Sequence, residues 1–316
     1  MGELLYLTRS EVEGLLDIDA MLGALAGALI KYSAGTTSVP PRTSARVGDK
    51  GLLGAMPGYV PGVALEVKLV SVFPGNNRLG IPSHQALIMV FDESNGSPVA
   101  LMDGTFITAI RTGGAAAVAA GALARENSSV LAILGAGVQG WSHLETFPRV
   151  RDFSEIRIAS RNAERASALA ARHPAAHVAG SFEEAVRGAD VVACCTDARE
   201  PVIHHEWLAA GTHVSSVGGT FGPEIDPATI AACRVFVEWR GAATSPPPAG
   251  AAELQGIAPD KLTEVGEVLS GDRPGRQSPT EITVYKSTGI AVEDAAAARL
   301  VYDAALARGI GAKLTL

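Results

Sequence analysis

The sequence is poor in cysteine, in aromatic residues and in positive charge. Its three cysteines are Cys194, Cys195 and Cys233, and an odd number with two adjacent makes a poor disulfide framework. A reducing cytoplasm is therefore the expected compartment. Lys and Arg number 26 against 33 Asp and Glu, and the net charge of −7 argues against a broad basic face for nucleic acid.

Long uninterrupted apolar runs are also missing. No stretch reaches the roughly 18 apolar residues of a membrane span, so none is expected. The first 16 residues carry acids early and lack an apolar core before a cleavage site, so no signal peptide is expected. With 47% hydrophobic and 19% charged residues, the 316-residue chain has a globular composition and room for two domains.

The first third predicts helices followed by strands. Thr8 and Glu11 have the spacing of a capping box, which opens a short helix. Asp17 or Asp19 then begins a longer helix that ends at Gly35. Four apolar runs follow, separated by Gly, Pro and Asn, as is typical of successive strands. They cover residues 51–60, 64–73, 85–92 and 97–104, and a helix is predicted over 107–124.

From Ser128 onward, strands alternate with helices. This spacing predicts a parallel sheet with crossover helices. The Pro- and Ala-rich segment 241–251 is interpreted as a surface loop with no chemical role. A last helix is predicted over 292–308, with acids at its start suited to the helix dipole and Gly309 as its stop.

A glycine motif of the form G-x-G-x-x-G follows the apolar strand that ends near Leu134. Because it lies between a strand and a helix, with a second strand ending about 20 residues later, it indicates a dinucleotide site. Gly135 permits the tight turn, Gly137 lets the backbone approach a pyrophosphate, and Gly140 lets helix pack on strand. The predicted cofactor site comprises Gly135, Gly137, Val138, Gln139 and Gly140, together with Thr112, Thr196 and Val217.

The end of the second strand indicates which dinucleotide binds. An acid there would bind the ribose hydroxyls and repel a 2′-phosphate, but the sequence reads Ser160-Arg161-Asn162. Ser160 can donate to a phosphate, and Arg161 can pair with its charge. NADPH is therefore the predicted cofactor. The alternative is that Arg161 is a solvated surface residue.

No metal site is expected. His204, His205 and Glu206 resemble a metal cluster, but adjacent histidines on extended backbone point to opposite sides. We interpret them as a surface turn before a helix.

At this point the chain resembles the ornithine cyclodeaminase/mu-crystallin family, and within it the ketimine reductases. The resemblance covers nearly the whole chain. The matching segments are PPR (40–42), VKLVSVFPGN (67–76), GIPSHQA (80–86), LMDGTFITAIRTGGAA (101–116), LGAGVQG (134–140) and VYKSTGIAVEDAAAARLVYD (284–303).

The resemblance implies an α/β chain of two domains. Residues 121–287 would form the Rossmann dinucleotide-binding domain. Residues 1–120 and 288–316 would form an α+β domain that binds substrate and makes a homodimer through its sheet. The open apolar strands of that domain, which have no obvious covering helices, point to a dimer independently.

The resemblance also implies that basic residues bind a substrate carboxylate: Arg42, Lys68 and Arg111. A guanidinium can meet a carboxylate with two parallel hydrogen bonds. Lys68 lies in an apolar run, where an unpaired charge is costly, so it needs a partner unless it points to solvent from an edge strand. Ser83 could orient the substrate or the nicotinamide, and His84 is either a proton donor or structural.

One position departs from the cyclodeaminases, which place an aspartate after the V-G-G of a Rossmann strand. Here Thr220 follows Val217-Gly218-Gly219, and a threonine hydroxyl is no base near neutral pH. Glu224 and Asp226 are interpreted as part of a following turn and helix start. The ketimine reductases also lack that aspartate, and a cyclic ketimine can arrive protonated, so the departure favours reduction of a C=N bond.

Four functions stay open at this stage. The first is NADPH-dependent reduction of a cyclic imino acid such as pyrroline-2-carboxylate or piperideine-2-carboxylate. The others are a cyclodeaminating lyase, an alanine-dehydrogenase-like enzyme and a non-catalytic ligand binder. Thr220 weakens the second and third, while the intact glycine motif and the three basic residues weaken the fourth. No nucleic acid or membrane partner is expected.

Overall fold

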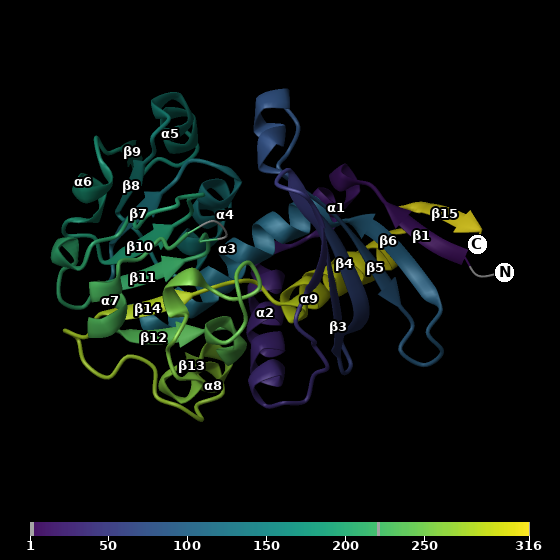
Figure 1. The fold of residues 1–316 in the computed structure, drawn as a ribbon. Helices are drawn as coiled ribbons and strands as arrows, with labels where there is room; N and C mark the ends of the chain where they lie inside the picture. The colour runs from purple at the N-terminus through teal and green to yellow at the C-terminus, as the bar shows by residue number, and fades with distance from the viewer. Residues whose placement is uncertain (1–2, 220–221, 316) are drawn as a thin grey trace. The chain divides into compact units, whose positions relative to one another are not determined.

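The computed structural model describes residues 3–219 and 222–315 (Figure 1). The chain divides into two compact units. The first contains Met1–Arg111 and Ile290–Leu316, and the second contains Thr112–Gly289. The predicted boundaries at 120/121 and 287/288 are close to these, but the first junction lies earlier, inside a helix.

A seven-stranded sheet forms the centre of the first unit, in the order β15-β1-β6-β5-β4-β3-β2. β1 is parallel to β6, and the other neighbouring pairs are antiparallel. The strands are β1 (Glu3–Leu7), β2 (Thr43–Val47), β3 (Gly51–Val60), β4 (Ala64–Val72), β5 (His84–Phe91), β6 (Pro98–Asp103) and β15 (Ala312–Thr315). The four predicted strands are confirmed as β3 to β6; β1, β2 and β15 were not predicted.

The helices of this unit are α1 (Arg9–Leu15), α2 (Ile18–Ser33) and α9 (Ala291–Arg308). The predicted capping box of Thr8 and Glu11 is confirmed, and Asp17 caps α2 by accepting a hydrogen bond from the Ala20 amide at 2.8 Å. Gly309 ends α9 with a φ of 63°, a conformation that favours glycine. α9 packs on α2 and on strands β3 and β4.

The two faces of this sheet differ in what covers them. Side chains alternate between faces along each strand. On β4, Glu66 and Lys68 are each 1% exposed and lie on the face against which α9 packs. Leu69 lies on the opposite face and is 43% exposed.

The second unit has an eight-stranded parallel sheet in the order β13-β12-β14-β11-β10-β7-β8-β9. The run β9-β8-β7-β10-β11-β14 has the strand arrangement of a Rossmann fold, as predicted. The strands are β7 (Val130–Leu134), β8 (Glu155–Ala159), β9 (Ala176–Val178), β10 (Val191–Cys194), β11 (His213–Ser216), β12 (Arg234–Val237), β13 (Thr263–Glu264) and β14 (Thr283–Lys286).

Among the described residues of this unit, five short helices lie entirely within it: α4 (Val138–Thr146), α5 (Ala163–Ala170), α6 (Phe182–Val186), α7 (Pro227–Ala232) and α8 (Val265–Leu269). Single 3-10 turns join the elements of the chain at Pro74–Leu79, Phe147–Arg149, His205–Trp207, Arg240–Ala243, Ala252–Leu254 and Pro259–Lys261. The helix predicted after His205 is only such a turn.

The helix α3 (Gly104–Leu123) contains the junction between the units, so the predicted boundary at 120 is too late. The reason is the packing of its later turns. A Cβ on Gly113 would lie 2.2 Å from Ser142 Oγ, so α3 approaches α4 closely from residue 113 onward. α3 is apolar and long enough to cross a membrane, but 83% of its apolar window is buried, as in a core helix of a globular protein.

Candidate active site

The loop after β7 carries the glycine motif. Gly135 has a φ of 111°, and a Cβ there would lie 2.5 Å from the carbonyl oxygen of Cys195. A Cβ on Gly140 would lie 2.1 Å from the carbonyl oxygen of Gly135. Both positions therefore require glycine so that the loop, α4 and the end of β10 can pack together.

Gly137 is different, because a Cβ there would meet no atom within 4 Å. It is the N-cap of α4 and provides no side-chain cap, and Val138 beside it is exposed. A helix N-terminus with an open glycine lets backbone N–H groups approach a pyrophosphate, so these residues fit a dinucleotide.

The residues predicted to recognise a 2′-phosphate lie just after β8. Arg161 is exposed and donates from Nη2 to Asp197 Oδ1 at 2.9 Å. The Arg161 side chain is solvated, and sequence reasoning missed its partner Asp197. Ser160 Oγ accepts from the Asn162 amide at 3.2 Å. Asn162 caps α5, with its side chain accepting from the Arg165 amide at 2.8 Å.

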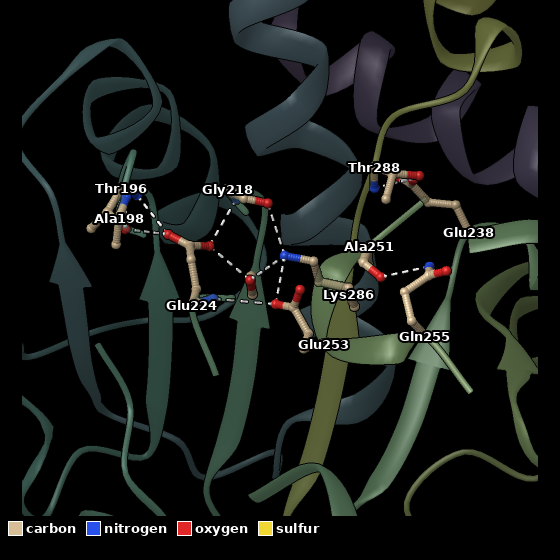
Figure 2. Close-up of polar contacts among 11 residues, drawn as sticks. Thr196, Ala198, Gly218, Glu224, Glu238, Ala251, Glu253, Gln255, Lys286 and Thr288 are labelled. Atoms are coloured by element: carbon tan, nitrogen blue, oxygen red, sulfur yellow. Dashed lines mark hydrogen bonds and ion pairs between the residues drawn. The ribbon is translucent and has the colours of Figure 1, made fainter. Parts of the chain in front are cut away.

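A buried carboxylate joins the ends of β10 and β11 (Figure 2). Glu224 Oε1 accepts from the Thr196 amide at 2.7 Å and from Thr196 Oγ1 at 2.6 Å. Its Oε2 accepts from Ser216 Oγ at 2.7 Å and from the Gly218 amide at 2.8 Å. The prediction that Glu224 belongs only to a turn is therefore wrong, since it fixes two strand ends; Asp226 does cap the following helix, α7.

Lys286, the last residue of β14, also binds the end of β11 (Figure 2). Its Nζ donates at 2.8 Å both to Ser216 Oγ and to the Gly218 carbonyl. It also pairs with Glu253 Oε1 at 3.0 Å. Gly218 is thus bonded through its N–H and its C=O to opposite charges, which orders the loop at Val217.

A second charged cluster lies in the first unit, between β4 and the start of α9. Lys68 Nζ is 2.7 Å from Asp294 Oδ2, and Arg111 Nε donates to Asp294 Oδ1 at 2.9 Å. Arg111 also pairs with Glu293 through Nη1. The expectation that Lys68 needs a partner is confirmed, and the edge-strand alternative is wrong because β4 lies between β3 and β5.

Sequence reasoning missed both partners of these cations. Glu293 and Asp294 were interpreted as acids that suit the dipole of the last helix. They are 0% exposed and belong to this charge cluster instead. The signal was their position beside the apolar segment STGIAV, which indicates burial rather than a solvated first turn.

Burial and neighbouring charges shift the titration of the cluster. Desolvation, and then the positive charge of Arg111, lower the pKa of Lys68 to about 8. Burial raises the pKa of Asp294, but Arg111 and Lys68 outweigh it, and the net shift is downward. Burial and repulsion by Asp294 raise the pKa of Glu66 well above its usual range, which favours its neutral form.

The other predicted substrate residues lie close to Lys68. The charge of the half-buried Arg42 contributes to lowering the pKa of Lys68. Ser83 Oγ lies 3.1 Å from His84 Nδ1. His84 is exposed at the start of β5, yet desolvation by nearby protein atoms, and then the charge of Lys68, lower its pKa. The structure thus brings Arg42, Lys68, Arg111 and His84 together.

Three further residues named in the sequence analysis are Thr112, Val217 and Thr220. Thr112 is buried in α3, directly after Arg111. The amide of Val217 donates to the Cys194 carbonyl at 3.1 Å, which continues the β10–β11 pairing. Thr220 lies outside the described residues.

The histidine segment shows no ligand geometry. His204 stacks edge-on against Trp207, with ring centroids 4.5 Å apart. Across residues 3–219 and 222–315, no group of three or more His, Cys, Asp or Glu side chains is placed to hold a metal ion.

Comparison with known proteins matches this architecture over its whole length. The sequence model of the ornithine cyclodeaminase/mu-crystallin family matches residues 3–309. The ketimine reductase mu-crystallin of Mus musculus is 40% identical over 307 residues, which cover 94% of this chain and 96% of the mouse protein.

Two solved structures are similar in both sequence and fold. One is the Δ1-pyrroline-2-carboxylate reductase of Thermococcus litoralis, in complex with NADH and L-proline. It is 33% identical, with a TM-score of 0.92, and the match covers 98% of this chain and all of that one (100%). The other is an archaeal alanine dehydrogenase dimer with bound NAD, 33% identical with a TM-score of 0.90, matched over 100% of both chains.

Proposed function

This chain belongs to the ornithine cyclodeaminase/mu-crystallin family, and on that premise we propose that it reduces the C=N bond of a cyclic imino acid with NADPH. The substrates would be of the pyrroline-2-carboxylate or piperideine-2-carboxylate type, and the product the cyclic amino acid. Two similar proteins, a ketimine reductase and a pyrroline-2-carboxylate reductase, support the reaction class.

The observation that carries the proposal is the charge of the cluster around Lys68. Arg42, Lys68 and Arg111 supply three positive charges. Glu293 and Asp294 supply two negative charges, while burial without a hydrogen-bond partner among the described residues favours the neutral form of Glu66. The cluster therefore has a net charge of +1, which one substrate carboxylate would neutralise. A dianionic substrate would leave excess charge in a buried place, which is unfavourable.

The residues of the cluster have distinct tasks in this proposal. Lys68 and Arg111 bind the carboxylate, and Asp294 holds both cations in place from behind. Arg42, which is only half buried, adds the third charge from a loop. When bound, the cofactor supplies a hydride from C4 of its nicotinamide to the imine carbon. The protein's contribution is orientation, because hydride transfer needs the two carbons aligned and close.

Protonation of the imine is assigned to the substrate rather than to His84. The lowered pKa of His84 leaves its ring mostly neutral at neutral pH, so it is a poor resident acid. A neutral imidazole that shares a hydrogen bond with Ser83 can still accept or donate one to the ring nitrogen of the substrate. We therefore propose that Ser83 and His84 orient the imine.

NADPH is proposed over NADH because Arg161 is available to a 2′-phosphate. Its pair with Asp197 is made between side chains that are 78% and 70% exposed. Ion pairs this exposed are weak, so a phosphate can replace the carboxylate at small cost. Ser160 follows the strand with its hydroxyl beside Arg161, and no acid ends β8.

The test is a cofactor-oxidation screen with purified protein. Five- and six-membered cyclic 2-imino acids, and acyclic 2-oxo acids with ammonia or methylamine, are offered with NADPH and with NADH. We expect oxidation of NADPH with a cyclic imino acid and formation of proline or pipecolate. Turnover only with pyruvate and ammonia would instead identify an alanine dehydrogenase. In a separate incubation of ornithine with NAD⁺, conversion to proline and ammonia without net reduction of the cofactor would identify a lyase.

We further propose that the chain forms a homodimer through the open face of its first sheet. Cross-strand register places Leu53, Leu69 and Leu87 on this face, exposed by 49%, 43% and 46%. Val47 on β2 extends the patch. Apolar side chains on a sheet face are usually covered, and the similar archaeal alanine dehydrogenase is a dimer.

Light scattering at micromolar concentration tests the dimer. A mass of twice 32.5 kDa is expected. Leu69→Glu should shift the protein toward monomer, while Leu306→Glu, a change to an exposed leucine on α9, should not. A monomer mass for the unchanged protein would contradict this part of the proposal.

A further inference from the structure

The buried network around Lys286 lies at the nicotinamide half of the Rossmann sheet. In this fold the dinucleotide binds at the carboxyl ends of the strands, with its adenosine half toward β8 and its nicotinamide half toward β10, β11 and β14. Thr196, Ser216 and Lys286 stand at or just after the carboxyl ends of those three strands. Glu224 and Glu253 link them (Figure 2).

Glu224 is present as a carboxylate. Four groups donate to its two oxygens, two from Thr196, one from Ser216 and one from Gly218. Ser216 Oγ receives a hydrogen bond from Lys286 Nζ, so its own hydrogen is directed to Glu224. Each oxygen accepts from one backbone amide, that of Thr196 or of Gly218, and amides can only donate, so this surrounding favours the ionised carboxylate.

Glu253 is the second carboxylate of the network. Its Oε1 pairs with Lys286 Nζ at 3.0 Å and accepts from the Glu224 amide at 3.4 Å. Its Oε2 is buried and accepts no hydrogen bond from the described residues. A Cβ on Gly219 would lie 2.9 Å from Lys286 Nζ and 3.4 Å from that oxygen, so the pair lies directly against the backbone of Gly219.

Two carboxylates against one ammonium leave this network with a net charge of −1. Lys286 is 0% and Glu253 2% exposed, so solvent screens that charge poorly. A buried negative charge favours any neighbouring group in its positive form. The nicotinamide ring is neutral in NADPH and positive in NADP⁺, so the two cofactor states differ where this charge acts.

We propose that Lys286, Glu224 and Glu253 are charge-tuning residues that stabilise the oxidised nicotinamide. By this inference the network lowers the free energy of the positive ring relative to the neutral one, and so assists hydride donation without touching the substrate. The inference rests on the proposed NADPH-dependent function. It assigns to this chain's own residues a task separate from cofactor affinity as such.

The measurement is the ratio of the dissociation constants of NADP⁺ and NADPH, obtained by titrating the full chain with each nucleotide. Glu253→Gln removes one negative charge and keeps an oxygen that can accept from Lys286 and from the Glu224 amide. We expect the ratio of the NADP⁺ dissociation constant to the NADPH dissociation constant to rise roughly three- to tenfold. This is about the effect of one charge on another at about 10 Å with an effective dielectric constant near 20, after a reduction for screening by solvent. If the role of Glu253 were purely structural, the variant would bind both nucleotides more weakly and the ratio would be unchanged.

Two further variants separate charge from structure. The double variant Glu253→Gln/Lys286→Met removes one charge of each sign, so its network keeps the net charge of −1. Its ratio should return to within about twofold of the unchanged protein, although it lacks more contacts. Lys286→Met alone should lower the ratio, and it replaces Glu253→Gln as the decisive test if that variant fails to fold.

Asp190→Asn is the matched control. Asp190 is also a bonded acid of this sheet, accepting from the amides of Ser129 and Val130 at 2.8 and 3.0 Å, but it lies at the amino-terminal edge. The ratio of dissociation constants in Asp190→Asn should stay within about twofold of the ratio in the unchanged protein. If Glu253→Gln and Lys286→Met both leave the ratio unchanged, the inference is overturned while the proposed function stands. If the unchanged protein binds neither nucleotide, the proposed function fails first.

Discussion

The two units bury charge in opposite ways. In the first, Lys68 and Arg111 meet Asp294 and Glu293, so charge is balanced by charge. In the second, carboxylates are held largely by neutral donors. Glu238, for example, accepts from Tyr285 and Ser287 hydroxyls at 3.0 and 2.6 Å, and from the Thr288 and Gly289 amides.

The difference indicates what each network can do. A cation that is paired with another side chain can also bind an incoming carboxylate without breaking a backbone hydrogen bond. A carboxylate that accepts backbone N–H groups fixes the loops that bear them, and any exchange would unfold a turn. The first arrangement suits recognition of a small anion, and the second suits a rigid platform.

Removing the central acid of the first network should have the largest effect. Asp294→Asn leaves Lys68 and Arg111 with a single carboxylate, Glu293, in a buried place. We expect a loss of about 3–5 kcal/mol in the free energy of unfolding, as for other broken buried ion pairs. Urea denaturation measures it. Asp303→Asn, on the same helix but in an exposed pair with Arg299, should cost about 0.5 kcal/mol or less. If both variants lost the same free energy of unfolding, the buried cluster would be no more important to stability than the exposed pair.

Removing a cation from the same network should act on catalysis. Lys68→Met leaves the substrate carboxylate partly desolvated without its partner, which costs on the order of 2–5 kcal/mol. The value of kcat/KM for the best cyclic imino acid should therefore fall roughly 30- to several-thousand-fold. Arg111→Ala should act in the same direction. If Lys68→Met were nearly silent while Thr220→Val abolished turnover, the chemistry would centre on the strand end after Gly219.

The ion pair of Arg161 and Asp197 is exposed to solvent, in contrast to the two buried networks. Arg161→Ala removes the proposed contact with the 2′-phosphate, and a charge-assisted hydrogen bond contributes about 1.5–3 kcal/mol. NADPH binding should weaken roughly 10- to 100-fold, with NADH nearly unchanged. Fluorescence titration of both cofactors is the measurement. Asp197→Asn is the control and should leave NADPH binding equal or slightly tighter, because it frees Arg161. Equal weakening of both cofactors by Arg161→Ala would show that Arg161 does not read the phosphate.

The smallest expected effect is on the pH profile. Burial lowers the pKa of Lys68 to about 8, so Lys68 carries its charge below that pH and loses it above. If the charged form binds the carboxylate, kcat/KM should fall about tenfold per pH unit above 8. The substrate imine also loses a proton on the alkaline side. The decline should therefore weaken in Lys68→Met, and an identical decline in that variant would assign it to the substrate alone.

Local sequence rules predicted most of the backbone. The capping box at Thr8, the stop at Gly309 and the strands β3 to β6 each depend on neighbours close in the chain. The cofactor loop was predictable for the same reason, since three glycines between a strand and a helix serve nearby backbone. The unpredicted strands β1, β2 and β15 have five residues or fewer. β1 pairs with β15 and β6, which lie far along the chain, while the largely polar β2 forms a hairpin with β3.

The charge networks were only half predictable. The cations were found because they interrupt apolar runs or fall in matching motifs, but their partners lie far along the chain. Asp294 is 183 residues from Arg111, and no local pattern connects them. Glu253 follows the segment 241–251, which was interpreted as a loop without a chemical role. That segment is irregular, yet the turn after it delivers Glu253 to Lys286.

The glycine loop imposes two separate kinds of selection on one short motif. Positions 135 and 140 are closed to other residues by the chain's own atoms, so variants there would be lost in a library screened only for folding. Position 137 faces open space, so in the same screen it would accept many residues. Only a screen that demands nucleotide binding would restore glycine at 137. The difference between the residues accepted at position 137 in the two screens would therefore locate the nucleotide site without a bound nucleotide in the structure.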